Sequence, residues 1–494
     1  MAQTDYLRTG VAGLDDVLDG GFSPGNIFLI EGNPGTGKTT LAVQFMLAGA
    51  EAGERGLYVT MSETEAELRA GAASHGWDIA SRFDVFQVTP PEVSPSSQEQ
   101  TLLYSSDLEL GETTKLILDR IEKTRATRIV IDSLSEIRLL AQSSLRYRRQ
   151  ILALKHYFAS QGATVLMLDD LTSEKHDKTV HSIAHAVIKL EELVHDYGPS
   201  RRRLRVTKYR GHAFRAGFHD FAIRTGGVAV FPRLVAAEYR ANYRRKQLSS
   251  NNPEFDQLLG GGVETGSSTL ILGPAGTGKS TLAMQFMSAA VERGEKCAMF
   301  VFDEELGLLF ERSRPLGFDL AAWRDAGLLH ISQVDAAELS PGEFTQRVRD
   351  LMNDNDLTCV VIDSLNGYRA AMPDELSLTL HMHELLQFLN RHGVASFLTL
   401  SQHGVVGIAE TPVELTYLAD TVVLLRYFEA SGAIHRAVSV IKKRTGEHEQ
   451  TIREFHIDAT GLVMGRPLTA FRGILEGSPV FIGDSDALIE QRKA

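Results

Sequence analysis

The sequence predicts an α/β protein made of two tandem domains, each with a mostly parallel sheet flanked by helices. A glycine-rich segment at 32–39 recurs at 273–280, an offset of 241 positions, and the same offset relates residues on both sides of the two segments. Each segment follows an apolar run of strand length and precedes a helical pattern. Whole domains are therefore repeated, because the period far exceeds that of a solenoid unit.

In each copy, strands and helices are expected to alternate along the chain. Helices are predicted from Lys38 to about Ala52 and over Ser144–Gln161, where apolar residues recur at helical spacing. Such alternation gives a parallel sheet that binds ligands at the carboxyl ends of its strands. The strands are predicted at Ile27–Glu31, Leu57–Met61, Arg128–Ile131, Thr164–Leu168 and Leu204–Thr207, and in the second copy at Ala298–Phe302, Val360–Ile362 and Val438–Ile441.

Changes in the repeat offset set the expected domain boundaries. The offset falls to 231 where Asp132 pairs with Asp363, so the first copy carries extra residues, which we assign to the Pro/Ser-rich stretch Thr89–Ser106, a predicted surface loop. A basic stretch near the middle of the chain shows no strand alternation and is predicted to be a linker. The expected parts are a first domain at 1–232, the linker at 233–247, a second domain at 248–475 and a short tail at 476–494.

Composition excludes several classes of protein. The chain has 494 residues, of which 43% are hydrophobic, and a net charge of −12. No apolar run is long enough to cross a bilayer and no basic-then-apolar signal opens the chain, so a cytoplasmic protein without a membrane partner is expected. The acidic balance argues against broad nucleic-acid binding. Cys297 and Cys359 are predicted to be buried thiols in a reducing compartment.

Both repeated segments satisfy G-x-x-x-x-G-K-[ST], the pattern of a phosphate-binding loop (P-loop). Its glycines let consecutive backbone N–H groups wrap around phosphate oxygens, and its lysine reaches the outer phosphates. ATP and Mg²⁺ are the expected ligands, with Thr39 and Ser280 in the metal shell. The residues predicted to bind the nucleotide are Gly32, Asn33, Pro34, Gly35, Thr36, Gly37, Lys38, Thr39 and Thr40, and Gly273, Pro274, Ala275, Gly276, Thr277, Gly278, Lys279, Ser280 and Thr281.

Two apolar strands that end in aspartate are predicted to complete the metal shell. Asp132 ends the strand that begins at Arg128, and Asp363 ends its counterpart. Many strands end in Asp, so the pattern alone is weak. A P-loop at the right distance upstream in both copies favours Mg²⁺ ligation.

Acids that follow the second strand of each copy are candidates for the catalytic base. Glu63 follows the strand that ends at Met61, and Asp303 and Glu304 follow the strand that ends at Phe302. A carboxylate at this place could orient and deprotonate the attacking water. An acid that only stabilises a helix start is the alternative, and the matched positions favour catalysis.

A Lys-x-Arg pair occurs late in each copy, as Lys208 with Arg210 and Lys442 with Arg444. Each pair follows an apolar strand and places two cations on the same side of an extended chain. Such cations can stabilise charge on a transferring phosphoryl group. A solvated edge strand is the alternative, and recurrence in both copies favours function.

Together these motifs resemble the KaiC family, the double-domain branch of the RecA/DnaB-like P-loop ATPases, over essentially residues 5–475. The resemblance implies two tandem RecA-like domains and a homohexamer of two stacked rings, with ATP between neighbouring subunits. The Lys-x-Arg pairs would then act on ATP held by the adjacent subunit. It further implies a slow ATPase in the first ring and transfer of phosphate to Ser/Thr residues of the protein itself in the second.

The sequence departs from the clock-type members of that family at several places. The family has adjacent glutamates where this chain has Ser62-Glu63 and Asp303-Glu304. At the family's phosphorylation segment, Thr416 falls at the serine position and Tyr417 replaces the threonine, so Thr416 is the one candidate phosphosite. The segment 466–494 shows no similarity to the clock protein's regulatory tail, and binding of the clock activator is not expected.

Three functions remain open at this point. The first is a hexameric ATPase with autokinase activity in its second domain, a signalling or timing switch with a KaiB-like or other signalling protein as partner. The second is a DNA-dependent RecA/DnaB-like ATPase, since Arg146, Arg148 and Arg149 surround Tyr147 and charge with an aromatic ring suits single strands. A solvated helix face explains that cluster equally well. The third is a scaffold that uses ATP only to assemble.

Overall fold

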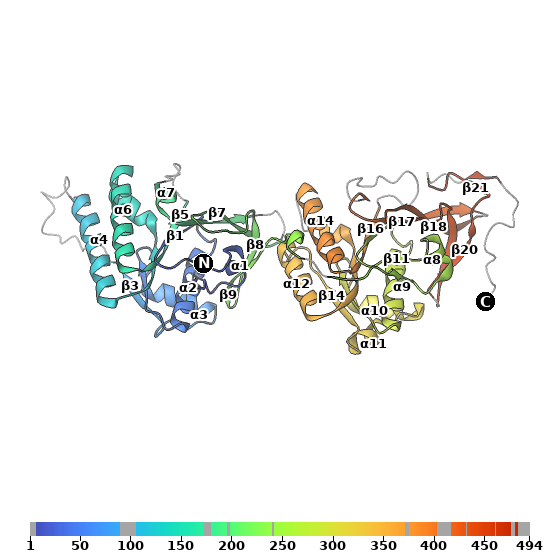
Figure 1. The fold of residues 1–494 in the computed structure, drawn as a ribbon, viewed down its shortest axis with the longest axis horizontal. Coiled ribbons are helices and arrows are strands. Elements are labelled where there is room, and N and C mark those ends of the chain that lie inside the picture. The colour runs from blue at the N-terminus through green and yellow to red at the C-terminus, as the bar shows by residue number, and fades with distance from the viewer. Residues whose placement is uncertain are drawn as a thin grey trace. The chain divides into compact units, whose positions relative to one another are not determined.

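The computed structural model describes residues 6–88, 105–171, 179–194, 198–239, 242–370, 375–402, 416–430, 432–459, 461–475 and 480–482. The chain divides into two compact units, Met1–Arg233 and Leu234–Ala494 (Figure 1). The predicted surface loop Thr89–Ser106 lies outside the described residues as far as position 104, and a helix begins at Ser105. The predicted tail is described only at 480–482.

The first unit is built on a sheet of nine strands that is mostly parallel, as predicted. The order is β3-β2-β4-β5-β1-β6-β7-β8-β9. Strands β3 to β6 in this order run parallel, and β6, β7, β8 and β9 pair antiparallel. The strands are β1 (Ile27–Gly32), β2 (Gly56–Thr60), β3 (Asp84–Gln87), β4 (Arg128–Asp132), β5 (Thr164–Asp170), β6 (Ala186–Leu193), β7 (Arg201–Tyr209), β8 (His219–Arg224) and β9 (Gly227–Phe231).

The second unit repeats this sheet strand for strand, in the order β14-β13-β15-β16-β12-β17-β18-β19-β20. Its antiparallel part again follows the strand beside the P-loop strand. The tandem α/β prediction is therefore confirmed. The strands are β12 (Ser268–Gly273), β13 (Lys296–Val301), β14 (Leu329–Gln333), β15 (Leu357–Asp363), β16 (Ala395–Ser401), β17 (Thr421–Ala430), β18 (Ala433–Lys443), β19 (Arg453–Asp458) and β20 (Gly461–Pro467).

Helices cover both faces of the first sheet because its central strands are apolar on both sides. In β1, Phe28 and Ile30 pack in one core cluster while Ile27 and Leu29 pack in the other, as the alternation of side chains along a strand requires. The first cluster lies under α1 (Leu14–Val17), α2 (Lys38–Glu51) and α3 (Glu65–Ser74), and the second under α4 (Ser105–Thr124), α5 (Leu134–Ala141), α6 (Ser144–Gln161) and α7 (Thr179–Ile183) (Figure 1).

The second sheet is covered in the same way. One face packs against α8 (Pro253–Leu258), α9 (Lys279–Glu292), α10 (Leu306–Ser313) and α11 (Leu320–Asp325), and the other against η2 (Ala236–Glu238), α12 (Pro341–Asp354), α13 (Leu365–Ala370) and α14 (Glu375–Arg391). Cys297 and Cys359 face each other on neighbouring strands as buried free thiols, as the composition predicted. The short elements are η3 (Arg314–Leu316) and the strand pairs β10 (Gln247–Leu248) with β11 (Val263–Glu264) and β21 (Phe471–Arg472) with β22 (Val480–Phe481).

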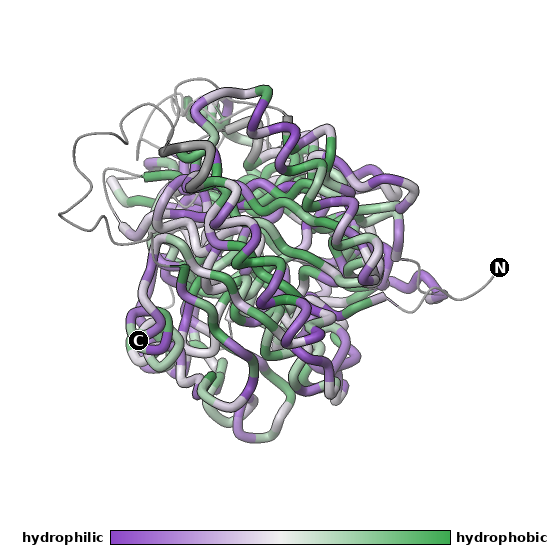
Figure 2. Tube along the Cα trace, turned by 90° about the vertical axis from the view of Figure 1, so that its left-hand side faces the viewer, coloured by the Kyte–Doolittle hydropathy of each residue, from purple (hydrophilic) through white to green (hydrophobic). Residues whose placement is uncertain are grey.

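The segment predicted as a linker contributes to the second core. Leu234 and Ala236 are buried there, and the Ala236 backbone N–H donates to Glu384 Oε2 at 2.8 Å. Figure 2 shows hydrophobic and hydrophilic stretches alternating along the trace. Among the described residues, none of the helices is long and apolar enough to cross a bilayer.

Candidate nucleotide and catalytic sites

The first P-loop connects the carboxyl end of β1 to the start of α2. Gly35 and Gly37 adopt φ values of 82° and 96°, a left-handed region that glycine enters without a Cβ clash. The conformation therefore favours glycine at Gly37, where a Cβ would also press on the movable end of the Ile223 side chain, 2.6 Å from Cδ1. The free backbone N–H groups at the helix start, with the helix dipole behind them, suit an anion such as phosphate.

The Lys38 side chain is folded back into this loop. Its Nζ donates to the carbonyls of Gly32 and Asn33 at 2.8 and 3.0 Å and lies 2.6 Å from Asp170 Oδ1. Lys38 is only 7% exposed, so the loop holds a cation where an outer phosphate would lie.

The predicted Mg²⁺ ligands of the first unit come together. Thr39 Oγ1 donates to Asp132 Oδ2 at 3.1 Å, and the buried Tyr58 hydroxyl donates to the same oxygen at 2.7 Å. Burial raises the pKa of Asp132, and these hydrogen bonds oppose the rise. A hydroxyl and a carboxylate at a strand end, open to further oxygen ligands from phosphate and water, fit the preference of Mg²⁺.

The second P-loop has the same backbone form. Gly276 and Gly278 have φ values of 77° and 104°, and α9 begins at Lys279. Lys279 Nζ donates to the Pro274 carbonyl at 2.8 Å, and burial lowers the pKa of this lysine, while Asp363 acts in the opposite direction.

Asp363 differs from its counterpart in the side chain that orients it. The Asp363 carboxylate accepts a hydrogen bond from Thr399 Oγ1, a neighbour on β16. In the first unit the orienting donor is Tyr58, on β2. The two carboxylates are thus held from opposite sides of the strand that carries them.

Glu63 lies at the rim of a cavity of about 430 Å³ beside the first P-loop. Its backbone is fixed by Thr60 Oγ1, which donates to the Glu63 carbonyl at 2.7 Å. Burial, and then the charge of Asp132, raises the pKa of the Glu63 carboxyl. The cavity is lined by Thr39, Thr40, Val43, Ser62, Glu63, Glu67, Leu68, Gly71, Ala72, Ser74, His75 and Trp77.

The two acids of the second unit are each engaged by a neighbour. Ser364 Oγ donates to the Asp303 carboxylate. Arg312 binds Glu304 through two parallel hydrogen bonds, from Nε to Oε1 and from Nη2 to Oε2, each of 2.6 Å. The structure therefore places Glu63 and Glu304 at equivalent strand ends in different surroundings.

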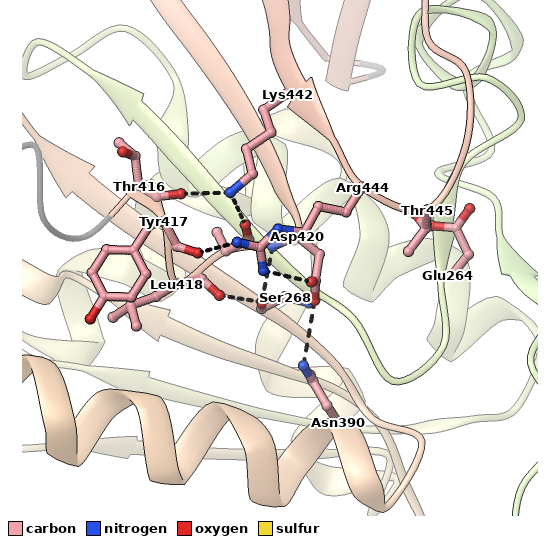
Figure 3. A network of polar contacts seen from close by, with 11 residues as sticks. Glu264, Ser268, Asn390, Thr416, Tyr417, Leu418, Asp420, Lys442, Arg444 and Thr445 are labelled. Atoms are coloured by element: carbon pink, nitrogen blue, oxygen red, sulfur yellow. Dashed lines mark hydrogen bonds and ion pairs between the residues drawn. The ribbon is translucent and has the colours of Figure 1, made fainter.

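The two Lys-x-Arg pairs make the same contacts in both units. Lys208 Nζ donates to the carbonyls of His181 and Ala184, and Lys442 Nζ donates to those of Thr416 and Ala419. Arg210 donates to the Ser182 carbonyl as Arg444 does to that of Tyr417 (Figure 3). Burial lowers the pKa of both lysines.

Strand register places these cations away from the P-loop of their own unit. Lys442 pairs with Val422 at the start of β17, and Val422 lies beside Leu270, three residues before Gly273, where the P-loop begins. At about 3.3 Å per residue, this separates Lys442 from the strand end by roughly 10 Å. The charged ends of both pairs lie toward the amino ends of the parallel strands.

Several residues at the sites were not found from the sequence. Asp170 and Asp169 end β5, which runs two residues further than predicted. Asp169 pairs with Arg138. The Asp-Asp dipeptide after an apolar run was a usable signal for Asp170, whereas Tyr58, Thr399 and Arg312 sit in patterns that do not distinguish them from ordinary strand and helix residues.

The aromatic residue offered for nucleic-acid stacking is not at the surface. Tyr147 is 0% exposed, and the Arg138 guanidinium lies 5.2 Å from the centre of its ring. A ring enclosed in this way has no face for a base, so the alternative in which Tyr147 stacks on a single strand is wrong.

Comparison with known proteins identifies a family whose model matches both units. A family model described as the KaiC ATPase matches residues 7–235 and again residues 249–468. The circadian clock protein KaiC3 of a Synechocystis species is 28% identical over 488 residues, which cover 98% of this chain and 96% of that protein. The circadian clock oscillator proteins KaiC of Thermosynechococcus vestitus and Synechococcus elongatus are each 27% identical, over 97% and 96% of this chain and 93% and 92% of their own lengths.

Proposed function

This chain belongs to the KaiC family of ATPases, and from that premise we propose a homohexamer that binds ATP with Mg²⁺ in both domains and hydrolyses it. The second domain also transfers phosphate to the protein's own Thr416. The assembly acts in the cytoplasm as a nucleotide-driven signalling or timing switch, read by a KaiB-like or other signalling protein.

The contact between Thr39 and Asp132 carries the ATPase proposal. The hydroxyl and the carboxylate lie 3.1 Å apart beside a P-loop whose lysine is already buried in the loop. Thr39 and Ser280 with Asp132 and Asp363 would hold Mg²⁺, which neutralises phosphate charge when bound. Lys38 and Lys279 would exchange carbonyl partners for phosphate oxygens.

Glu63 and Glu304 are the proposed bases of hydrolysis. The water oxygen bonds to the γ-phosphorus, the bond from that phosphorus to the bridging oxygen breaks, and ADP leaves with the electron pair. The water proton passes to the carboxylate, which contributes typically about 10²–10⁴-fold to such reactions. The raised pKa of Glu63 brings its basicity closer to neutral pH.

The position of the Lys-x-Arg pairs supports assembly. Since Lys442 lies toward the amino end of β17, about three residues from the end that carries the P-loop, it is poorly placed to reach ATP bound in its own unit. A neighbouring subunit offers the pair an ATP to contact, as in interfaces that supply an arginine in trans.

Thr416 is the proposed phosphate acceptor. The Thr416 carbonyl accepts a hydrogen bond from Lys442 Nζ, and Thr416 is partly exposed just before the start of β17. The segment 403–415 before it lies outside the described residues. Transfer would join the Thr416 hydroxyl oxygen to the γ-phosphorus while the bond from that phosphorus to the bridging oxygen breaks. ADP leaves with the electron pair and the hydroxyl proton is released to water, so ATP is the only co-reactant.

The experiment incubates γ-labelled ATP with the wild-type protein, with Lys38→Ala, with Lys279→Ala and with the double variant. Native mass spectrometry checks that each protein assembles. Each lysine variant should lose the turnover of one site, and the double variant should lose all. Label should be found by mass spectrometry at Thr416 in wild type and be absent from Lys279→Ala. Full turnover in the double variant contradicts the ATPase proposal, and unlabelled 400–430 peptides beside active hydrolysis contradict the kinase proposal alone.

A further inference from the structure

One position in the helix that follows the strand-tip acid holds a cation in the second unit and a glycine in the first. Thr64 caps α3 as Glu305 caps α10, each accepting hydrogen bonds from the first turn. With these caps aligned, Gly71 corresponds to Arg312, two turns into the helix. The two acids Glu63 and Glu304 directly precede the caps.

Arg312 forms an ion pair with the Glu304 carboxylate. Both carboxylate oxygens accept a guanidinium N–H at 2.6 Å, the bidentate form that is the strongest arrangement for this pair. Glu304 is 21% exposed and Arg312 35%, so the pair is partly shielded from water. The pKa of Arg312 is raised first by this bond and further by the charge of Asp363, so the guanidinium lies within the field of the proposed metal ligand.

In the described part of the first unit, no comparable cation lies at the acid. Among the described residues, no ion pair reaches the Glu63 carboxylate, and the space beside it is the cavity lined by Gly71 and Ala72. Three further carboxylates, those of Asp132, Glu67 and Asp170, are close enough to act on it electrostatically. Glu63 is thus surrounded by negative charge, whereas Glu304 is matched by a cation.

We propose that Arg312 is a positioning residue that holds Glu304 in a charge-compensated state and so makes ATP hydrolysis slower at the second site than at the first. The inference rests on the proposed ATPase function. A general base must receive a proton on a carboxylate oxygen in the transition state, and both Glu304 oxygens already accept a hydrogen bond from Arg312. The fixed guanidinium also holds the carboxylate oxygens toward α10.

Slow hydrolysis at the second site has a functional consequence. ATP that is not lost to water stays available for transfer to a hydroxyl acceptor, and the first site is free to turn over. One position, glycine in α3 and arginine in α10, would then separate the two activities.

The structure permits a reciprocal exchange as the test. A Cβ added at Gly71 meets nothing within 4 Å, and Gly71 lies inside a helix, so Gly71→Arg is sterically free and suits helix geometry. Arg312→Gln removes the charge at similar length, and Arg312→Lys keeps the charge without the fork.

Second-site turnover is measured in a Lys38→Ala background and first-site turnover in a Lys279→Ala background, with assembly and thermal unfolding recorded for each variant. We expect Arg312→Gln to raise the second-site kcat about fivefold or more, with KM changed less than about twofold, and Gly71→Arg to lower the first-site kcat by a similar factor. Arg312→Lys should lie between wild type and Arg312→Gln.

A second-site kcat that is unchanged or lower in Arg312→Gln, in a variant that assembles and unfolds as wild type, overturns the inference. So does an unchanged first-site kcat in Gly71→Arg. Failure of the underlying ATPase proposal is distinct, because the two background proteins would then show no turnover before any exchange is made.

Discussion

Lys38 Nζ and Asp170 Oδ1 lie 2.6 Å apart, which ties the P-loop lysine of the first unit to the end of β5. In the described part of the second unit, no carboxylate lies at that place. Asp170 pairs in register with Gly32, and the residue that pairs in register with Gly273 is Ser401. The first lysine must therefore leave an anion when it turns to a phosphate, and the second lysine need not.

We predict that Asp170→Asn strengthens ATP binding at the first site. The lost competitor is an ion pair whose aspartate is 27% exposed. Partly exposed pairs typically contribute about 0.2–1 kcal/mol, so the Kd should fall by roughly 1.4- to 5-fold. The measurement is titration with a fluorescent ATP analogue in a Lys279→Ala background. Ser401→Asp in a Lys38→Ala background is the matched control and should weaken binding, and tighter binding in both variants would contradict the prediction.

We predict that Tyr58→Phe weakens Mg²⁺ binding at the first site alone. The Tyr58 hydroxyl donates to Asp132 Oδ2 at 2.7 Å, and loss of such an outer partner costs about 10–100-fold in metal affinity or activity. Mg²⁺ dependence of turnover, measured in a Lys279→Ala background, should shift by about tenfold. Thr399→Val is the equivalent change beside Asp363, read in a Lys38→Ala background. An unchanged Mg²⁺ midpoint in Tyr58→Phe would contradict the role given to its hydroxyl.

The sequence was sufficient to predict the features that both units share, but not the side-chain contacts in which the two units differ. Both sheets and both P-loops follow from local pattern, since apolar runs and fixed glycine spacings determine strand, loop and helix. The roles of Arg312 and Asp170 depend on partners that the fold brings close, which are Glu304, eight residues away, and Lys38, which follows the neighbouring strand β1. The stacking role considered for Tyr147 was wrong for the same reason, because the burial of its ring beneath Arg138 depends on packing between α5 and α6.

We predict that Lys442 and Arg444 act on a neighbour's ATP. One set of subunits carries Lys442→Ala with Arg444→Ala, and another carries Lys279→Ala, both with Lys38→Ala to silence the first site. Each set alone should have little second-site turnover. Mixed rings should regain part of it, because an intact P-loop then lies beside an intact cation pair.

The contacts of Lys442 give this experiment its control. The lysine also holds the carbonyls of Thr416 and Ala419, so a purely internal role would disable the P-loop-intact subunit itself. In that case mixing restores nothing. Native mass spectrometry confirms that mixed rings form, and absence of recovery in such rings would contradict action between subunits.

Stability of the first unit should fall between pH 6.5 and 4 because His219 is buried in its neutral form. The Arg233 backbone N–H donates to His219 Nδ1 at 2.9 Å, and Nε2 faces the Arg215 carbonyl at 2.9 Å, so a proton on Nδ1 would break the first bond. Burial lowers the His219 pKa to about 4. The unfolded chain binds the proton first, so the contribution of His219 is complete above pH 6.5 and about 3 kcal/mol smaller below pH 4. His219→Asn keeps an acceptor for the Arg233 N–H, and it should lose less unfolding free energy than wild type between pH 7 and pH 4.5. The free energy is measured by urea titration, with hydrogen exchange of residues Met1–Arg233 as the signal. An equal loss in wild type and variant would contradict the assignment.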